Sequence, residues 1–176
     1  TEKFRILSPE ARQLVLSAIC HWDNLRWKLV SAVVMPDHVH LIARPLANDS
    51  RSRLETGSTW GSTWDISKIL HSIKSFSANE VNKLEGKAGR PVWQAESYDR
   101  VIRNEKEFAA ELAYLNHNPV KVEPASSRLS CSYPYLYNAP ELIAAGWKPA
   151  PLGKINYTVW SDVFVCPECT REVIFW

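Results

Sequence analysis

The chain has 176 residues, 45% of them hydrophobic, and a formal net charge of +2 at pH 7. This length and apolar content predict one ordinary domain with a buried core, and the low net charge excludes a strong basic field over the whole surface. No stretch approaches the roughly 20 apolar residues of a membrane span, and the polar first residues do not resemble a signal peptide. We therefore expect a cytoplasmic protein without a membrane partner, whose four cysteines stay reduced.

The first predicted elements are a helix and two strand-like runs. Ser8 is a good N-cap and Pro9 suits the first helical position, so a helix is expected from there to about residue 22. Residues 27–35 and 38–44 are rich in Val and Leu and predict strands. Pro36 and Asp37 interrupt them, and the sequence does not distinguish a hairpin from a kinked strand at this point.

Two histidines stand in the second of these runs. Residues i and i+2 of a strand share a face, so His38 and His40 are expected to point the same way, with Val39 and Leu41 pointing the other. Two imidazoles on one face form a candidate divalent-metal site, and Asp37 is a candidate hydrogen-bond partner for one of them. The alternatives are a strand with two outward polar residues and an aspartate that serves the turn alone.

Residues 45–64 predict a loop with a tandem Gly-Ser-Thr-Trp repeat. Its Trp60 and Trp64 are able to stack on unpaired bases, but a duplication tolerated in a surface loop is the favoured interpretation. A long amphipathic helix is expected at 66–84, capped by Asp65. Its predicted apolar stripe consists of Ile66, Ile69, Leu70, Ile73, Phe76, Val81 and Leu84. Residues 92–94 and 98–103 predict short strands.

A second clear helix is expected from Asn104 to about His117, with Pro119 ending it. Tyr114 and Asn118 are four residues apart and are therefore neighbours on this helix, beside its apolar stripe. His117 falls on the opposite side and is left out of the candidate site. Two imidazoles and the amide oxygen of Asn118 form a ligand set for Mg²⁺ or Mn²⁺, and a nearby tyrosine is able to attack phosphorus. For Tyr114 alone, a buried packing role is the alternative.

These motifs occur in a recognisable order. Met35-Pro36-Asp37-His38-Val39-His40-Leu41-Ile42 is followed by residues 68–76, by 92–94, by 98–104 and by Tyr114-Leu115-Asn116-His117-Asn118-Pro119-Val120-Lys121. Together they resemble the REP-associated tyrosine transposases, single-strand DNA transposases with a His-x-His motif and one catalytic tyrosine. The resemblance covers roughly residues 5–125.

The resemblance implies an α+β, ferredoxin-like fold, with helices packed on an antiparallel sheet. It implies Mg²⁺ or Mn²⁺ held by His38, His40 and Asn118, and Tyr114 as the nucleophile of a DNA-nicking and strand-transfer enzyme. The expected product is a 5′-phosphotyrosine, and the expected partner is single-stranded DNA beside a repeat hairpin, which also predicts association with the nucleoid. Tyr98 is the other candidate nucleophile. A homodimer is an alternative, with the tyrosine acting in cis or in trans.

Candidate DNA contacts are the basic residues of the matched region, with ordinary solvated charges as the alternative. The candidates are Lys68, Lys74, Arg90, Arg100, Arg103 and Lys121.

The expected organisation is a transposase-like domain at 1–130, an irregular extension at 131–154 and a foreign-looking tail at 155–176. Few residues precede Ser8, so we expect the first strand of the family to be missing and a sheet edge to be exposed. Cys166 and Cys169 in the tail resemble a zinc knuckle of some DNA methylases, but one CxxC supplies two ligands where structural zinc needs four. An inactive hairpin-binding derivative is therefore the main alternative function, and a methylase fragment a weaker one.

Overall fold

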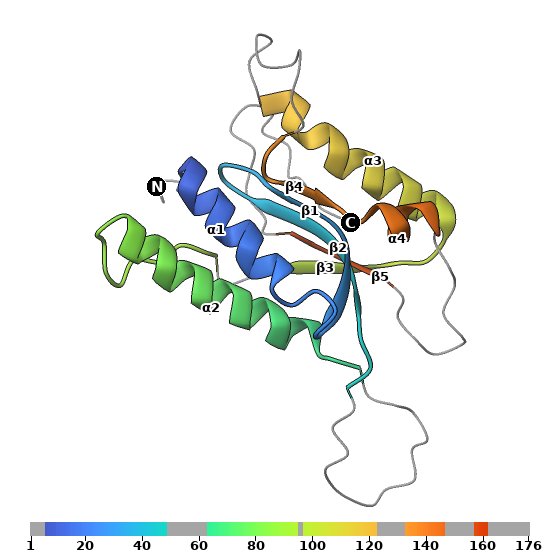
Figure 1. The fold of residues 1–176 in the computed structure, drawn as a ribbon, viewed down its shortest axis with the longest axis horizontal. Coiled ribbons are helices and arrows are strands. Elements are labelled where there is room, and N and C mark those ends of the chain that lie inside the picture. The colour runs from blue at the N-terminus through green and yellow to red at the C-terminus, as the bar shows by residue number, and fades with distance from the viewer. Residues whose placement is uncertain (1–5, 49–62, 95–96, 123–132, 147–156, 162–176) are drawn as a thin grey trace, which may run out of the picture.

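The computed structural model describes residues 6–48, 63–94, 97–122, 133–146 and 157–161. In these residues helices and strands alternate along the chain, except that β1 is followed directly by β2 (Figure 1). The helices are α1 (Pro9–Cys20), α2 (Ile66–Leu84), α3 (Glu105–Val122) and α4 (Pro140–Ala144). The strands are β1 (Trp27–Val34), β2 (Val39–Pro45), β3 (Tyr98–Ile102), β4 (Leu136–Asn138) and β5 (Tyr157–Ser161).

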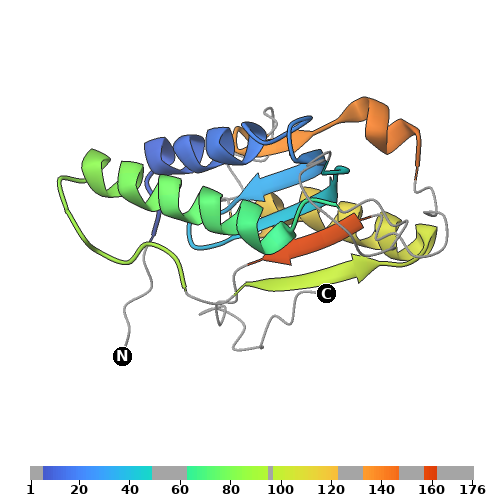
Figure 2. The same ribbon diagram turned by 90° about the horizontal axis from the view of Figure 1, so that it is seen from below.

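The strands form one sheet in the order β3-β5-β2-β1-β4, and all neighbours in it are antiparallel. α1 and α2 lie side by side on one face, while α3 packs against β1 and β2 from the other (Figures 1 and 2). The predicted α+β class, with helices packed on an antiparallel sheet, is therefore confirmed.

Local sequence explains where the first two helices begin. The Ser8 hydroxyl accepts a hydrogen bond from the backbone N–H of Ala11, and the Asp65 carboxylate accepts one from the N–H of Ser67. Each cap satisfies an N–H that has no partner inside the helix. Both predicted caps are confirmed, and α2 has the predicted bounds.

The apolar stripe of α2 differs from the prediction at two positions. Ile69, Ile73 and Val81 are buried as predicted, but Phe76 and Leu84 are 56% and 52% exposed. Ser77 takes the buried position instead, because its hydroxyl donates to the carbonyl of Ile73 and accepts a hydrogen bond from the indole of Trp93. A polar side chain whose hydrogen bonds are satisfied can thus replace an apolar one in the interface.

The predicted end of α3 at Pro119 is wrong, because the helix continues to Val122. A proline removes one helical hydrogen bond, but it does not forbid a helix whose surroundings hold it. Asn118 and Pro119 are both buried, so packing against the sheet keeps the chain helical there. The predicted cap is confirmed in part: the Asn104 side chain accepts from the N–H of Glu107, while Glu107 accepts from the N–H of Arg103.

The C-terminal third contributes more regular structure than the sequence predicts. β4 and α4 lie within 131–154, which was expected to be irregular, and β5 lies within 155–176. Residues 92–94 form no strand, so that prediction is wrong. The boundaries at 130 and 154 stay predictions, and Cys131, Cys166 and Cys169 lie outside the described residues.

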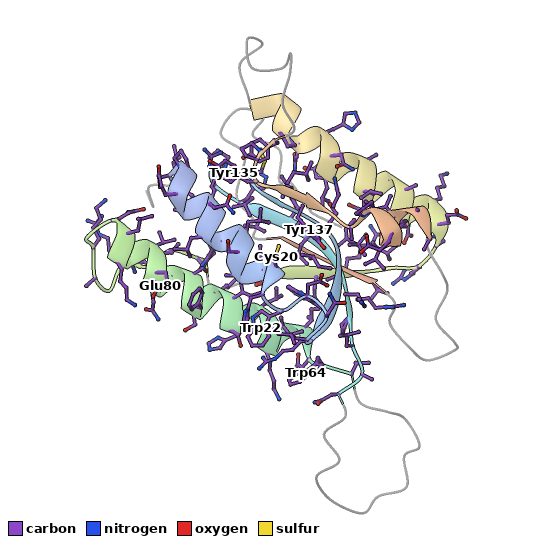
Figure 3. All side chains as sticks on the ribbon, viewed as in Figure 1. Cys20, Trp22, Trp64, Glu80, Tyr135 and Tyr137 are labelled. Carbon is purple, nitrogen blue, oxygen red and sulfur yellow. The ribbon has the colours of Figure 1, made fainter. Side chains whose placement is uncertain are left out.

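The side chains of Trp22 and Trp64 lie near the C-terminal end of α1 (Figure 3). The Arg26 guanidinium lies 3.7 Å from the ring centroid of Trp22 and 4.5 Å from that of Trp64. Trp64 therefore has a packing partner within the chain, while Trp60 lies outside the described residues. Cys20, labelled nearby, is a free cysteine, and burial raises the pKa of its thiol. No helix among the described residues has the length and apolarity needed to cross a membrane.

Candidate active site

The His-x-His motif begins at a tight β-hairpin. The backbone N–H of Met35 donates to the carbonyl of His38 over 2.8 Å, so Pro36 and Asp37 form the turn between β1 and β2. The N–H of Leu7, just before α1, donates to the carbonyl of Pro36 over 2.6 Å and ties the turn to the rest of the chain. Of the two alternatives left open by the sequence, the hairpin is therefore the observed one.

The alternation of β2 sorts its side chains between the two faces of the sheet. Val39, Leu41 and Ala43 belong to the apolar cluster under α1 and α2, whereas Ile42 belongs to the cluster under α3. His40 is fully buried on the α3 side. The predicted division of the faces is thus observed.

Asp37 orients the imidazole of His38. Its carboxylate lies 2.6 Å from Nδ1 of His38. This hydrogen bond lowers the pKa of Asp37 against the opposing effect of burial, so the carboxylate stays ionised. An ionised carboxylate accepts a hydrogen bond from the protonated Nδ1, and in that tautomer the free lone pair of the neutral imidazole is on Nε2.

Three rings from two distant segments meet on this face. The ring centroids of His38 and His40 lie 4.7 Å apart, and those of His40 and Tyr114 lie 5.5 Å apart in an edge-to-face arrangement. The hairpin supplies the histidines and α3 supplies the tyrosine. The fold therefore brings a pair of imidazoles and a phenol together.

Asn118 lies one helical turn after Tyr114 on α3. It is 5% exposed, and its buried Nδ2 makes no hydrogen bond to any of the described residues. The amide nitrogen is a hydrogen-bond donor, whereas the side-chain oxygen is the atom of Asn118 that is able to bind a cation. Asn118 is thus a buried polar side chain on the helix face that meets the sheet.

The residues fit a divalent cation. A metal–nitrogen bond of about 2.1 Å puts an imidazole centroid about 3.3 Å from the ion. If two imidazoles bind the same ion with a right angle between their bonds, their ring centroids lie about 4.6 Å apart. The observed 4.7 Å between His38 and His40 agrees with this spacing. No cluster of three His, Cys, Asp or Glu side chains occurs in the described part of the chain.

Several residues that the sequence did not single out hold α3 and the hairpin in place. Asn138 on β4 donates to the side-chain oxygen of Asn116 on α3 and accepts from the hydroxyl of Ser31 on β1. Tyr133 donates its hydroxyl proton to the carbonyl of Val34 and accepts a hydrogen bond from Arg12. These contacts join residues about 20 to 120 positions apart, and no local pattern in the sequence could have revealed them.

The candidate DNA-contacting residues do not form one patch. Lys68 is exposed on α2, where Lys74 donates to the carbonyl of Gln94. Arg100 lies 3.4 Å from Glu107 of α3, on the opposite side of the sheet. Arg90 and Arg103 are exposed, and the side chain of Lys121 lies outside the described residues.

The remaining candidates are His117 and Tyr98. His117 is exposed, with Nδ1 2.7 Å from the carbonyl of Ala113, in agreement with leaving it out of the site. Tyr98 is the first residue of β3, and its side chain lies outside the described residues.

Fold and site thus define an α+β protein with a histidine pair and a tyrosine on one face of its sheet. A comparison with curated proteins finds a REP-associated tyrosine transposase of Haemophilus influenzae that is 25% identical over 99 residues, 56% of this chain. The match spans about half, 53%, of that relative. No family model and no solved structure matches the chain. The similarity supports a relationship to transposases. The chemistry must be argued from the residues of the site.

Proposed function

We propose that this protein is a metal-dependent single-strand DNA transposase or endonuclease, which nicks and joins DNA beside repeat hairpins. The observation that supports this most directly is the contact between the rings of His40 and Tyr114, 5.5 Å apart at their centroids, with His38 beside them. The relative from Haemophilus influenzae is named as a REP-associated tyrosine transposase.

In the proposed reaction Tyr114 attacks the phosphorus of a phosphodiester. The new bond joins the phenolic oxygen to the 5′-phosphate, and the bond from phosphorus to the 3′-oxygen breaks, so that a free 3′-OH leaves with a proton. Attack of a 3′-OH on the phosphotyrosine reverses the step and releases the tyrosine. Each transfer exchanges one phosphodiester for another, and no external energy source is needed.

We assign the cation to His38, His40 and the amide oxygen of Asn118. Mg²⁺ or Mn²⁺ bound there would polarise the phosphate oxygens. The chain itself orients the ligands: Asp37 directs Nε2 of His38 into the site, and burial of His40 and Asn118 keeps water from competing for them.

The test is transfer of label from single-stranded DNA, with a palindromic hairpin and flanking sequence, to the protein on denaturing gels with Mg²⁺ or Mn²⁺. Wild-type protein is expected to form an adduct, and Tyr114→Phe to lower it by at least about 10³-fold, because the nucleophile is gone. Tyr98→Phe is the matched control and is expected to keep the adduct. An adduct lost in Tyr98→Phe and kept in Tyr114→Phe would move the nucleophile to Tyr98. Hairpin binding without any adduct would instead identify the inactive derivative.

We further propose that Tyr114 acts in cis, because it contacts His40 of its own chain. Mixing Tyr114→Phe with His38→Ala separates the possibilities. A tyrosine that acts in cis leaves the mixture inactive, whereas a shared site across a homodimer restores label transfer in part of the molecules.

DNA is the proposed partner, which would place the protein at the nucleoid. The exposed Lys68, Arg90 and Arg103 are the phosphate contacts we propose first. Each change to Gln is expected to reduce the slope of log affinity against log salt by about 0.7, because one fewer counterion is released from a single strand. Unchanged slopes would show that these charges are simply solvated.

A further inference from the structure

The two parallel strands joined by α2 do not touch each other. β2 and β3 each run antiparallel to β5, so they are parallel to one another, with β5 between them. This is a split β-α-β arrangement, and it leaves a gap one strand wide, roughly 10 Å between the outer strands. Whatever fills the gap must pair on both sides at once.

β5 fills it, with five residue pairs to β3 and four to β2. Its residues pair with β2 from His40↔Ser161 to Ala43↔Thr158, and with β3 from Tyr98↔Ser161 to Ile102↔Tyr157. All these partners lie at or before Ile102, far earlier in the chain. The strand between β2 and β3 therefore comes from residues 157–161, which follow β3 in the chain (Figure 2).

The position of β3 depends on this strand. Among the described residues, β5 is the sheet neighbour of β3, and only two residues lie between the end of β3 and the start of α3. Without β5, β3 would lose its sheet pairing, and the backbone groups of β2 beside His40 would be exposed. The start of the helix that carries Tyr114 is thus attached to the strand that carries His40 through β5.

We propose that the gap between β2 and β3 is a strand-binding site, that its occupant is the chain's own segment 157–161, and that filling it assembles the His40–Tyr114 pair. Binding of this kind uses main-chain hydrogen bonds on both edges of an extended segment. Tyr, Thr, Val and Trp in this segment are residue types that favour strands. The effect on catalysis rests on the proposed function, whereas the strand-binding site does not.

The test is hydrogen exchange on the full-length chain. Val159→Pro removes a backbone donor from the middle of β5, and Glu172→Pro is the matched control outside the strand. Protection of amides in 98–102 and 40–43 is expected to fall by at least about tenfold in Val159→Pro and to stay unchanged in the control. Equal protection in wild type and Val159→Pro would overturn the proposal.

A synthetic peptide of residues 155–165 provides the second arm. Added to Val159→Pro, it is expected to restore protection, whereas the same peptide carrying the proline is not. If Val159→Pro unfolds the whole chain, β1 amides also exchange, and refolding on addition of the peptide then supports the proposal. No restoration by the unmodified peptide overturns it.

Label transfer separates this inference from the function. If the peptide restores both exchange protection and adduct formation, occupancy of the gap assembles the site. If exchange responds and no protein forms an adduct, the strand-binding site stands and the proposed transposase activity is overturned. If adduct formation is equal in wild type and Val159→Pro, the role of β5 in assembling the site is overturned.

Discussion

The two faces of the sheet are built from different kinds of side chain. Under α1 and α2 lies the larger apolar cluster, with Leu29, Leu41 and Ile69 fully buried, and the buried Ser77 on this face is hydrogen-bonded to Ile73 and Trp93. Under α3 the cluster is smaller, and the buried polar residues His40 and Asn118 interrupt that side of the molecule. Burying polar groups opposes folding unless they are satisfied. The first face therefore stabilises the fold, and on the second face the amide nitrogen of Asn118, which makes no hydrogen bond to the described residues, opposes folding where the chemistry is proposed.

The largest change expected from breaking the first face is in stability. Ile69→Ala removes a fully buried side chain from α2, and the cavity is expected to lower the free energy of unfolding by about 2–5 kcal/mol. Urea denaturation measures the loss. Label transfer per folded molecule is expected to stay at the wild-type level, and a selective loss of transfer would show that the two faces are not separate.

The next effect concerns the metal site proposed on the second face. Asp37→Asn weakens the hydrogen bond that orients His38, and Mn²⁺ affinity is expected to fall by about 10–100-fold. Titration calorimetry with Mn²⁺ measures it. Asp65→Asn is the control, since asparagine caps a helix as well as aspartate does. Equal affinities for wild type and Asp37→Asn would remove Asp37 from the site.

Replacing the buried amide sharpens the contrast between stability and function. Asn118→Leu removes an amide nitrogen that makes no hydrogen bond to the described residues. We expect the free energy of unfolding to stay level or rise by up to about 1 kcal/mol, while metal-dependent label transfer is lost. A variant that is less stable but still active would contradict both roles given to Asn118.

The smallest effect is expected on the outer side of α2. Phe76→Ala changes a side chain that is 56% exposed, so the free energy of unfolding is expected to move by no more than about 0.5 kcal/mol. Compared with Ile69→Ala by urea denaturation on the same helix, it tests whether the apolar stripe has its observed bounds. A loss similar to that of Ile69→Ala would place Phe76 in the core.

Local patterns carried much of the fold. The caps at Ser8 and Asp65, the bounds of α2 and the alternation of β2 follow from residue types within a few positions of each other. The errors have non-local causes. Helix α3 passes Pro119 because packing holds it there, and Ser77 replaces Phe76 in the interface because Trp93 reaches it.

The same limit applies to the candidate site. The spacing of His38 and His40 on a strand, and of Tyr114 and Asn118 on a helix, is readable from the sequence. Their roles are predictions that the structure leaves to experiment. The supports from Tyr133 and Asn138 were not predicted, because their partners are far away in the chain.

By itself, the sequence determined the elements and the faces on which the candidate residues lie, because the periods of helices and strands are local properties of the backbone. The tertiary structure decided which elements meet. It brings α3 against the hairpin, so that Tyr114 reaches His40, and it puts β5 between β2 and β3. Pairing of this kind depends on which backbone edges and buried surfaces remain to be covered once the whole chain is folded, and no short stretch of sequence contains that information.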